Sequence, residues 1–180
     1  MLIDSHVNLH APQFAEDMDA VIDRARAAGV ALMVNISDKV STFDVTHRVA
    51  MDHPDIWATV GTHPHEAKEN PDLKASDLIA LAQRPKGFGI GECGLDFHYD
   101  LSPRDVQAAV FRQHCIAARE TGLPLVVHTR EADAVMGDIP YSDIFITGMI
   151  ISTHADFIKF KTQGFITYPN KSCLSESLFC

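Results

Sequence analysis

The sequence predicts an α/β fold in which parallel strands alternate with helices. Short apolar runs recur along the 180-residue chain, and segments with helically spaced apolar residues lie between them. Because the connections are short, consecutive strands are expected to pair in parallel through right-handed crossovers. The predicted strands are Leu2–Val7, Val30–Ile36, Ile56–Val60, Phe88–Gly91 and Leu125–Val127.

The polar side chains decide which parallel architecture is expected. His or carboxylate residues lie at or just after the ends of nearly all the apolar runs. Barrel enzymes build their sites from strand ends all around one rim, whereas a doubly wound sheet concentrates them at one switch point. The sequence therefore favours a TIM-type (β/α)₈ barrel. The residues concerned are His6, Asn8, His63, His65, Glu92, Asp96 and His128.

The helices between the strands have recognisable boundaries. In EDMDAVIDRARAAG the apolar residues recur at helical spacing up to Gly29, which is a typical stop. In SPRDVQAAVFRQHCIAARETG, Ser102 is the expected N-cap, Pro103 the first helical residue and Gly122 the terminator. Two further helices are expected around Ser41–Met51 and Ala75–Gln83.

Composition limits the class of protein. The net charge of −9 disfavours backbone-wide adhesion to nucleic acid, although bound cations can still serve a phosphate ester substrate. There is no bilayer-length apolar run and no signal-peptide pattern, so we expect a cytoplasmic protein without a membrane partner. The four cysteines show no C-x-x-C spacing, which fits a reducing compartment. No protein partner is predictable.

The first strand raises the question of a metal site. If LIDSHVNLH is extended, Asp4, His6 and Asn8 share one face, and on their own they are more simply satisfied by backbone or water. Glu92 closes GFGIGE and His128 ends its own apolar run, so the rim gathers N and O donors without thiolate. Such a set suits Zn²⁺, Mn²⁺ or Mg²⁺, and a carboxylate that bridges two ions suits attack on phosphodiesters.

Four motifs in this order, LIDSHVNLH, VGTHPHEA, GIGECGLDFHYD and PLVVHTREAD, resemble the TatD-type metal-dependent deoxyribonucleases of the amidohydrolase superfamily. The resemblance covers about residues 1–137. It implies a (β/α)₈ barrel that binds one or two divalent ions and hydrolyses phosphodiester bonds of DNA, typically from a 3′ end, with a metal-activated water. We therefore expect DNA ends or another phosphodiester as substrate.

The resemblance also implies roles for individual residues. His6 matches the first His of the family's H-x-H pair, Glu92 the carboxylate that can bridge the metals, and His128 the His on the fifth strand. His63 matches a His that faces the site and touches substrate or a ligand, and Asp96 and Arg130 also lie in matching positions. The expected catalytic residues are Glu92, Asp96 and His63, and the expected metal ligands are His6, Asn8, Glu92, His128 and His154.

This sequence departs from the family pattern in two places. Asn8 replaces the second His of H-x-H, which favours Mg²⁺ or Mn²⁺ over Zn²⁺ at one position, and His10 is a less favoured substitute. After residue 137 the pattern fades: GMIISTHADF, with His154, is the nearest match to the sixth strand, QGFITYP echoes the next, and no T-D-A-P-like segment follows.

These departures define the expected domain organisation. Residues 1–137 form the barrel portion of a metal-dependent hydrolase, and residues 138–180 form a divergent segment, truncated or frame-shifted. Six or seven of eight strands are then present, since a complete barrel takes about 250 residues. Two alternatives stay open: a related hydrolase of amides, esters or lactones, and a non-catalytic remnant. His47, His53, His98 and His114 are expected to be surface or packing residues.

Overall fold

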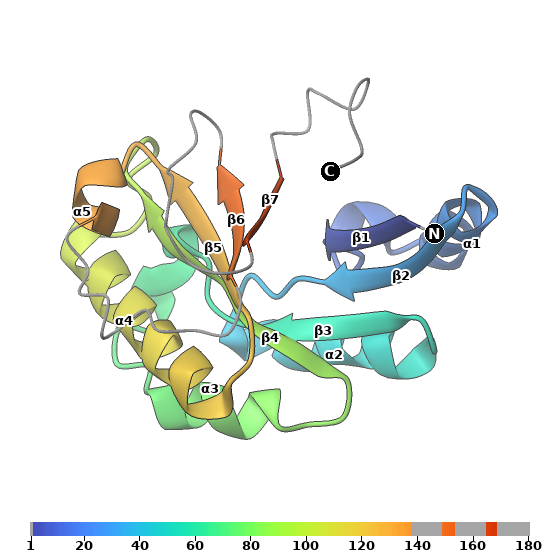
Figure 1. Cartoon of the computed structure of the whole chain (residues 1–180), viewed down its shortest axis with the longest axis horizontal. Coiled ribbons are helices and arrows are strands. Elements are labelled where there is room, and N and C mark those ends of the chain that lie inside the picture. The colour runs from blue at the N-terminus through green and yellow to red at the C-terminus, as the bar shows by residue number, and fades with distance from the viewer. Residues whose placement is uncertain (1, 138–148, 154–164, 169–180) are drawn as a thin grey trace.

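The computed structural model describes residues 2–137, 149–153 and 165–168 (Figure 1). In this part of the chain seven strands form one sheet in strict sequence order, and each pairs in parallel with the next. The strands are β1 (Leu2–Val7), β2 (Val30–Asn35), β3 (Ile56–Val60), β4 (Gly87–Asp96), β5 (Leu125–Arg130), β6 (Met149–Thr153) and β7 (Phe165–Tyr168).

Helices follow the strands on the outer side of the curled sheet, as Figure 1 shows for α2, α3 and α4. They are α1 (Met18–Ala27), α2 (Phe43–Asp52), α3 (Ala75–Ala82), α4 (Arg104–Thr121) and α5 (Asp133–Gly137), with 3₁₀ turns at Pro12–Phe14, Val40–Thr42 and Pro64–Glu69. Strand order never reverses, so the sheet has no switch point of the doubly wound kind. The prediction of an incomplete TIM-type barrel is confirmed.

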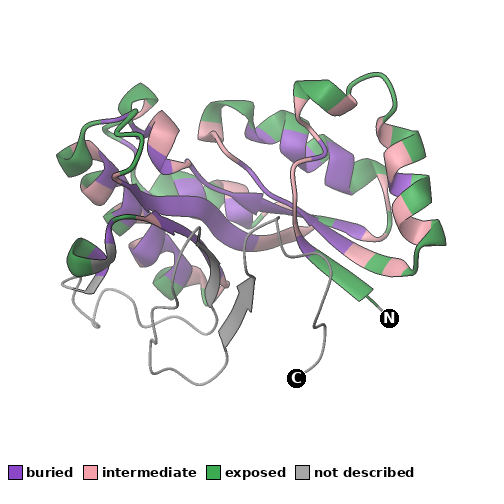
Figure 2. Ribbon diagram, turned by 90° about the horizontal axis from the view of Figure 1, so that it is seen from above, coloured by how far each residue is buried: buried purple, intermediate pink, exposed green. Residues whose placement is uncertain are grey.

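The core lies between the helices and the outer face of the sheet. Ile22 of α1, Phe43 of α2 and Leu78 of α3 are fully or almost fully buried against strand residues such as Ile56 and Ile90. Figure 2 shows the central strands buried and the helices buried mainly on their inner sides. In the described part of the chain, no helix combines the length and apolarity needed to cross a bilayer.

Strand β4 is longer than the apolar run Phe88–Gly91 predicted, because two glycines let it continue to Asp96. Gly91 and Gly94 have φ of +128° and +136°, a region that L residues rarely adopt. A Cβ at Gly91 would collide with the carbonyl of Val126, and one at Gly94 with the carbonyl of His128. The glycines therefore hold β4 close against β5, and Glu92 and Asp96 lie inside the strand rather than after it.

The start of α4 also differs from the prediction. Pro103 is the N-cap residue and has no side chain to cap the helix, so the assignment of Ser102 as N-cap is wrong. The Ser102 hydroxyl instead donates to the carbonyl of His65 (2.8 Å) and accepts the backbone N–H of Lys68 (3.1 Å). It thereby fastens the turn that follows β3. Gly122 ends α4 in the left-handed conformation, as predicted.

Candidate metal centre

Side chains from three strands and from the turn after a fourth meet at the carboxyl end of the sheet. His6 comes from β1, His63 from the turn after β3, Glu92 from β4 and His128 from β5. One candidate ligand atom each of His63, Glu92 and His128 lies within 4.8 Å of the other two. Segments more than 120 residues apart thus converge as the barrel prediction requires.

The register between β4 and β5 explains how His128 reaches two carboxylates. His128 pairs with Gly94, which lies between Glu92 and Asp96 on the same face of β4. Because Gly94 has no side chain, the backbone of His128 packs directly against it, and the His128 ring contacts both carboxylates. His128 Nδ1 is 3.6 Å from Glu92 Oε1, and its Nε2 is 2.9 Å from Asp96 Oδ2.

Glu92 lies between two histidines and remains ionised. Its Oε2 is 3.3 Å from His6 Nε2, while Oε1 faces His128. Burial alone would raise the pKa of this carboxyl, but the neighbouring rings of His128 and His6 outweigh it and hold the pKa well below its usual range. The side chain is thus a buried anion with one oxygen directed at each neighbouring imidazole.

Asp96 is fully engaged by the protein. Its Oδ2 accepts hydrogen bonds from His128 Nε2 (2.9 Å) and His65 Nε2 (2.8 Å), and its Oδ1 accepts the backbone N–H groups of His98 (3.1 Å) and Tyr99 (3.0 Å). Although burial opposes ionisation, these donors, first among them the Tyr99 N–H, lower the pKa of the carboxyl below its usual range. Asp96 therefore orients two imidazoles, and its predicted part in catalysis stays a prediction.

The two central histidines use their ring nitrogens differently. His128 donates through Nε2 to Asp96 and turns Nδ1 toward Glu92, which is the orientation of an imidazole whose other nitrogen binds a metal. His63 Nδ1 instead accepts the backbone N–H of His65 at 3.2 Å. Burial lowers the pKa of His63 to about 3, so the ring is neutral and carries its single proton on Nε2. His128 is therefore oriented as a metal ligand, and His63 as a hydrogen-bond donor.

His114 of α4 hydrogen-bonds the turn that carries His63. Thr62 donates its backbone N–H to His114 Nε2 (3.0 Å), and His114 Nδ1 donates to the carbonyl of Val110 (2.8 Å). Burial lowers the pKa of His114 to about 4, which keeps it neutral. The expectation of a packing or surface role missed this contact, because its partners lie 52 residues apart.

No hydrogen bond or ion pair joins the other candidate ligands to this cluster within the described residues. Asn8 is half-buried, and its side chain makes no hydrogen bond to any described residue. The mostly buried ring of His10 lies 3.3 Å from Asp38 and 3.4 Å from Asn35. His154 lies outside the described residues.

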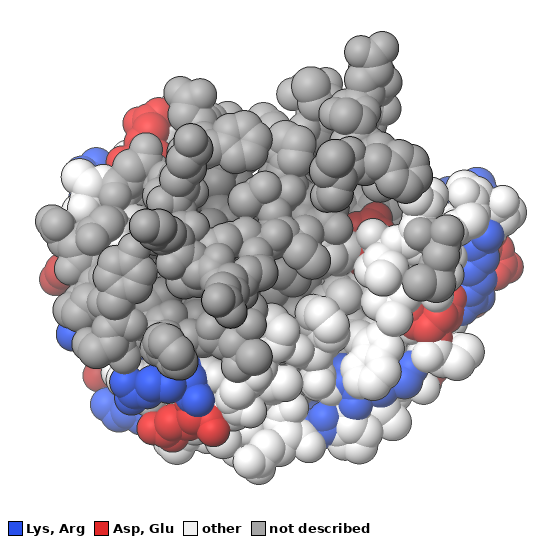
Figure 3. All heavy atoms as spheres, in the orientation of Figure 1, with Lys and Arg blue, Asp and Glu red and all other residues white. Residues whose placement is uncertain are grey.

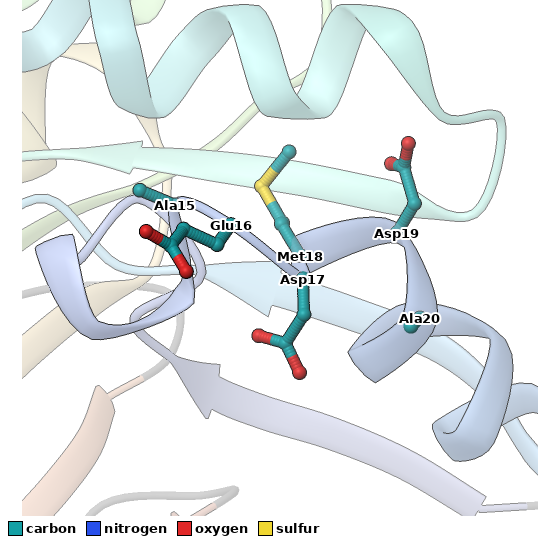
Figure 4. A pocket seen from close by; sticks show the side chains of 6 residues that line it. All are labelled: Ala15, Glu16, Asp17, Met18, Asp19 and Ala20. Atoms are coloured by element: carbon teal, nitrogen blue, oxygen red, sulfur yellow. The ribbon is translucent and has the colours of Figure 1, made fainter.

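His65 was not assigned a role from the sequence, yet it is central to the hydrogen-bond network. Its ring packs edge-on against that of His63, with 4.4 Å between ring centres, and it shares the Asp96 oxygen with His128. The H-P-H spacing at the end of an apolar strand is the signal that a second imidazole is held there. A shallow hollow elsewhere, lined by residues 15–20 before and at the start of α1, contains none of these side chains (Figure 4).

Comparisons with known proteins bear on this site. Residues 3–144 match the family model described as TatD related DNase. The chain is 42% identical over 132 residues to the 3′-5′ ssDNA/RNA exonuclease TatD of Erwinia tasmaniensis, and 35% identical over 132 residues to the uncharacterized metal-dependent hydrolase YabD of Bacillus subtilis. These matches cover 73% of this chain and 51% and 52% of the relatives, so the chain spans about half their length.

Solved structures show the same fold. A TatD homologue from Escherichia coli K12, YJJV, superposes with a TM-score of 0.76 at 23% identity, over 88% of this chain and 61% of that one. A TatD family hydrolase from Entamoeba histolytica gives a TM-score of 0.74 at 20% identity, over 83% and 57% of the two chains. Both solved chains are longer than this one.

Proposed function

Because the chain belongs to the TatD related DNase family, we propose that it is a divalent-metal-dependent hydrolase that removes nucleotides from the 3′ end of a nucleic acid strand. The observation that carries this proposal is the orientation of His128 between two ionised carboxylates. Asp96 bonds to one ring nitrogen, and Glu92 lies beside the other, where the two side chains can bind one cation together. The relatives' names supply the substrate class.

The residues present fit a divalent cation. Glu92 is ionised, as a metal ligand must be, and Asp96 holds Nε2 of His128 so that Nδ1 is directed at Glu92. We assign the cation to Glu92 and His128, with His6 on the other oxygen of Glu92. Asn8 and His154 remain proposed ligands. Two imidazole groups on opposite sides of one carboxylate allow one or two ions per chain.

The donor set bears on the identity of the metal. It contains nitrogen and oxygen without thiolate, which suits Mg²⁺, Mn²⁺ or Zn²⁺. An amide oxygen from Asn8 would favour Mg²⁺ or Mn²⁺. When bound, the cation would lower the pKa of a coordinated water and offset negative charge on the phosphodiester.

The other side chains have separate parts in the proposed reaction. His63 directs an N–H group into the site, where it donates a hydrogen bond to a phosphate oxygen. Asp96 keeps His128 and His65 in their orientations. We further propose that residues 1–137 contain the hydrolase site, that residues 138–180 form a divergent segment, and that the protein acts in the cytoplasm.

The test is cleavage of 5′-labelled single strands by the purified chain with added Mg²⁺, Mn²⁺ or Zn²⁺. Stepwise shortening that EDTA abolishes is expected, and Glu92→Gln should lower the rate at least about 100-fold. Glu131→Gln is the matched control, because that exposed carboxylate pairs only with His98 among the described residues. Failure of the folded, metal-loaded chain to cleave any strand would refute the proposal. Hydrolysis of esters, amides or lactones alone would support the related hydrolase instead.

A further inference from the structure

Beside the metal centre, we propose a nucleotide subsite in which Tyr99 stacks on a nucleobase and Arg130 holds a phosphate group. The proposal rests on the proposed function and names the substrate features that this site recognises. Tyr99 follows β4 and Arg130 ends β5, so both lie at the rim that carries the candidate ligands.

Tyr99 is an exposed aromatic ring in a fixed position. Its backbone N–H is bound to Asp96 Oδ1 at 3.0 Å, yet 54% of the residue is exposed. Its ring meets that of His65 edge-on at 5.6 Å between centres, and His65 in turn lies 4.4 Å from His63. A large ring held open next to a phosphodiester-cleaving centre suits a nucleobase, because every base has a π-face that stacks on aromatic side chains.

Arg130 is a cation whose hydrogen bonds are incomplete. Its guanidinium carbon lies 5.0 Å from the centre of the Tyr99 ring, and Nη1 is 3.7 Å from Asp96 Oδ2, too far for a hydrogen bond. The two oxygens of Asp96 already accept four other N–H groups. Nε is buried and has no hydrogen-bond partner among the described residues. A buried donor without an acceptor is costly, and a phosphate supplies acceptors in the geometry that guanidinium prefers.

A second Arg–aromatic pair nearby shows what a satisfied guanidinium looks like. Arg104 lies 4.4 Å from the ring centre of Phe97, but it donates to both oxygens of Asp100 at 2.8 and 2.6 Å. That pair is complete within the protein. Arg130 has no carboxylate within hydrogen-bond distance among the described residues, so its guanidinium can take an acceptor from a bound strand.

The charge of the protein explains why local contacts are needed. With a net charge of −9, the chain does not attract the nucleic acid backbone over a broad surface. On the face shown in Figure 3, the described Lys and Arg side chains are interspersed with Asp and Glu rather than forming a basic band. Binding of a strand end then depends on stacking and on about one phosphate contact. The salt dependence should be shallow, with a slope near −0.7 in log K against log salt concentration.

The experiment measures binding of a short fluorescein-labelled single strand by fluorescence anisotropy in EDTA, so that nothing is cleaved. Two strands are compared, one with a normal 3′-terminal nucleotide and one whose 3′-terminal base is absent. Tyr99→Ala should weaken binding of the normal strand about 5- to 150-fold and leave binding of the abasic strand unchanged. Tyr99→Phe should bind both as the wild type does.

Arg130 is tested in the same assay. Arg130→Gln should weaken binding of both strands equally and reduce the salt slope by about 0.7, because a phosphate contact does not depend on the base. Arg104→Gln is the matched control and should change neither quantity. Thermal melting of each variant shows whether it is folded.

If Tyr99→Ala loses the same affinity for the normal and the abasic strand, the stacking role is refuted. If the salt slope of Arg130→Gln equals that of the wild type, the phosphate contact is refuted. These failures are distinct from failure of the proposed function. A chain that shortens DNA but binds normal and abasic strands equally refutes the subsite alone. A chain that cleaves nothing, yet loses base-dependent binding in Tyr99→Ala, retains the subsite without the activity.

Discussion

Acid should destabilise this protein through a histidine that lies outside the candidate metal centre. His114 is fully buried on α4, where it accepts the Thr62 N–H and donates to the Val110 carbonyl. Burial lowers its pKa from 6.5 to about 4. Protonation in the folded state would place a second proton on the nitrogen that now accepts a hydrogen bond.

The direction and size of the change in unfolding free energy follow from the linkage between proton binding and folding. Between pH 6.5 and about 4 the unfolded chain binds a proton at His114 and the folded chain does not, so stability falls as pH falls through this window. The contribution is fully present above pH 6.5. At about 1.4 kcal/mol per pKa unit, the loss reaches about 3 kcal/mol once the pH is below 4. In urea this corresponds to a midpoint lowered by about 1–3 M.

The assay is urea unfolding of the wild type and of His114→Gln, followed by circular dichroism at several pH values from 7.5 to 4. Gln carries an acceptor that can reach the Thr62 N–H but has no proton to gain. The wild type should lose about 3 kcal/mol more than the variant over this range. His63 contributes equally to both proteins, so it cancels. If the free energy of unfolding falls equally with pH in the two proteins, the buried, neutral state of His114 is refuted.

Three further outcomes follow from the site and its supports. Asp96→Asn should lower metal affinity about 10- to 100-fold in titration calorimetry, because an amide that donates to His128 Nε2 reverses the ring's tautomer. Unchanged affinity would contradict the orienting role of Asp96. Gly94→Ala should lower the melting temperature more than Gly122→Ala, since both have positive φ but only Gly94 faces a carbonyl; equal losses would contradict the close approach of β4 to β5. Ser102→Ala should cost about 1–3 kcal/mol in urea unfolding, because it leaves the Lys68 N–H without its acceptor, and a neutral result would argue against that contact.

The sequence predicted the order and type of the elements well, because strand and helix periodicities are local. It placed the end of β4 too early for a physical reason. Apolar alternation stops at Gly91, but positive φ at Gly91 and Gly94 lets the chain continue beside β5 as far as Asp96. Hydropathy carries no information on φ. The consequence is that Glu92 and Asp96 share one face of a strand with His128 between them.

The site was predicted in part. Its strand-end residues His6, Glu92 and His128 do meet, as the common rim requires. Their hydrogen-bond partners were not predictable, because each contact joins distant segments: His65 with Asp96 across 31 residues, and Thr62 with His114 across 52. Such pairs leave no local pattern. The partner of each ring nitrogen likewise depends on the fold, so the structure is needed to show that His128 bonds to Asp96 through Nε2 and that His63 accepts a backbone N–H at Nδ1.

Metal content tests most directly whether side chains from separate strands together hold a cation. The purified chain is dialysed against Mn²⁺ and then against metal-free buffer, and the ions per chain are counted by mass spectrometry. At least one ion should remain in the wild type and in Glu131→Gln, and none in folded Glu92→Gln. A folded wild type that retains no ion, or a Glu92→Gln variant that retains as many as the wild type, would contradict this assignment.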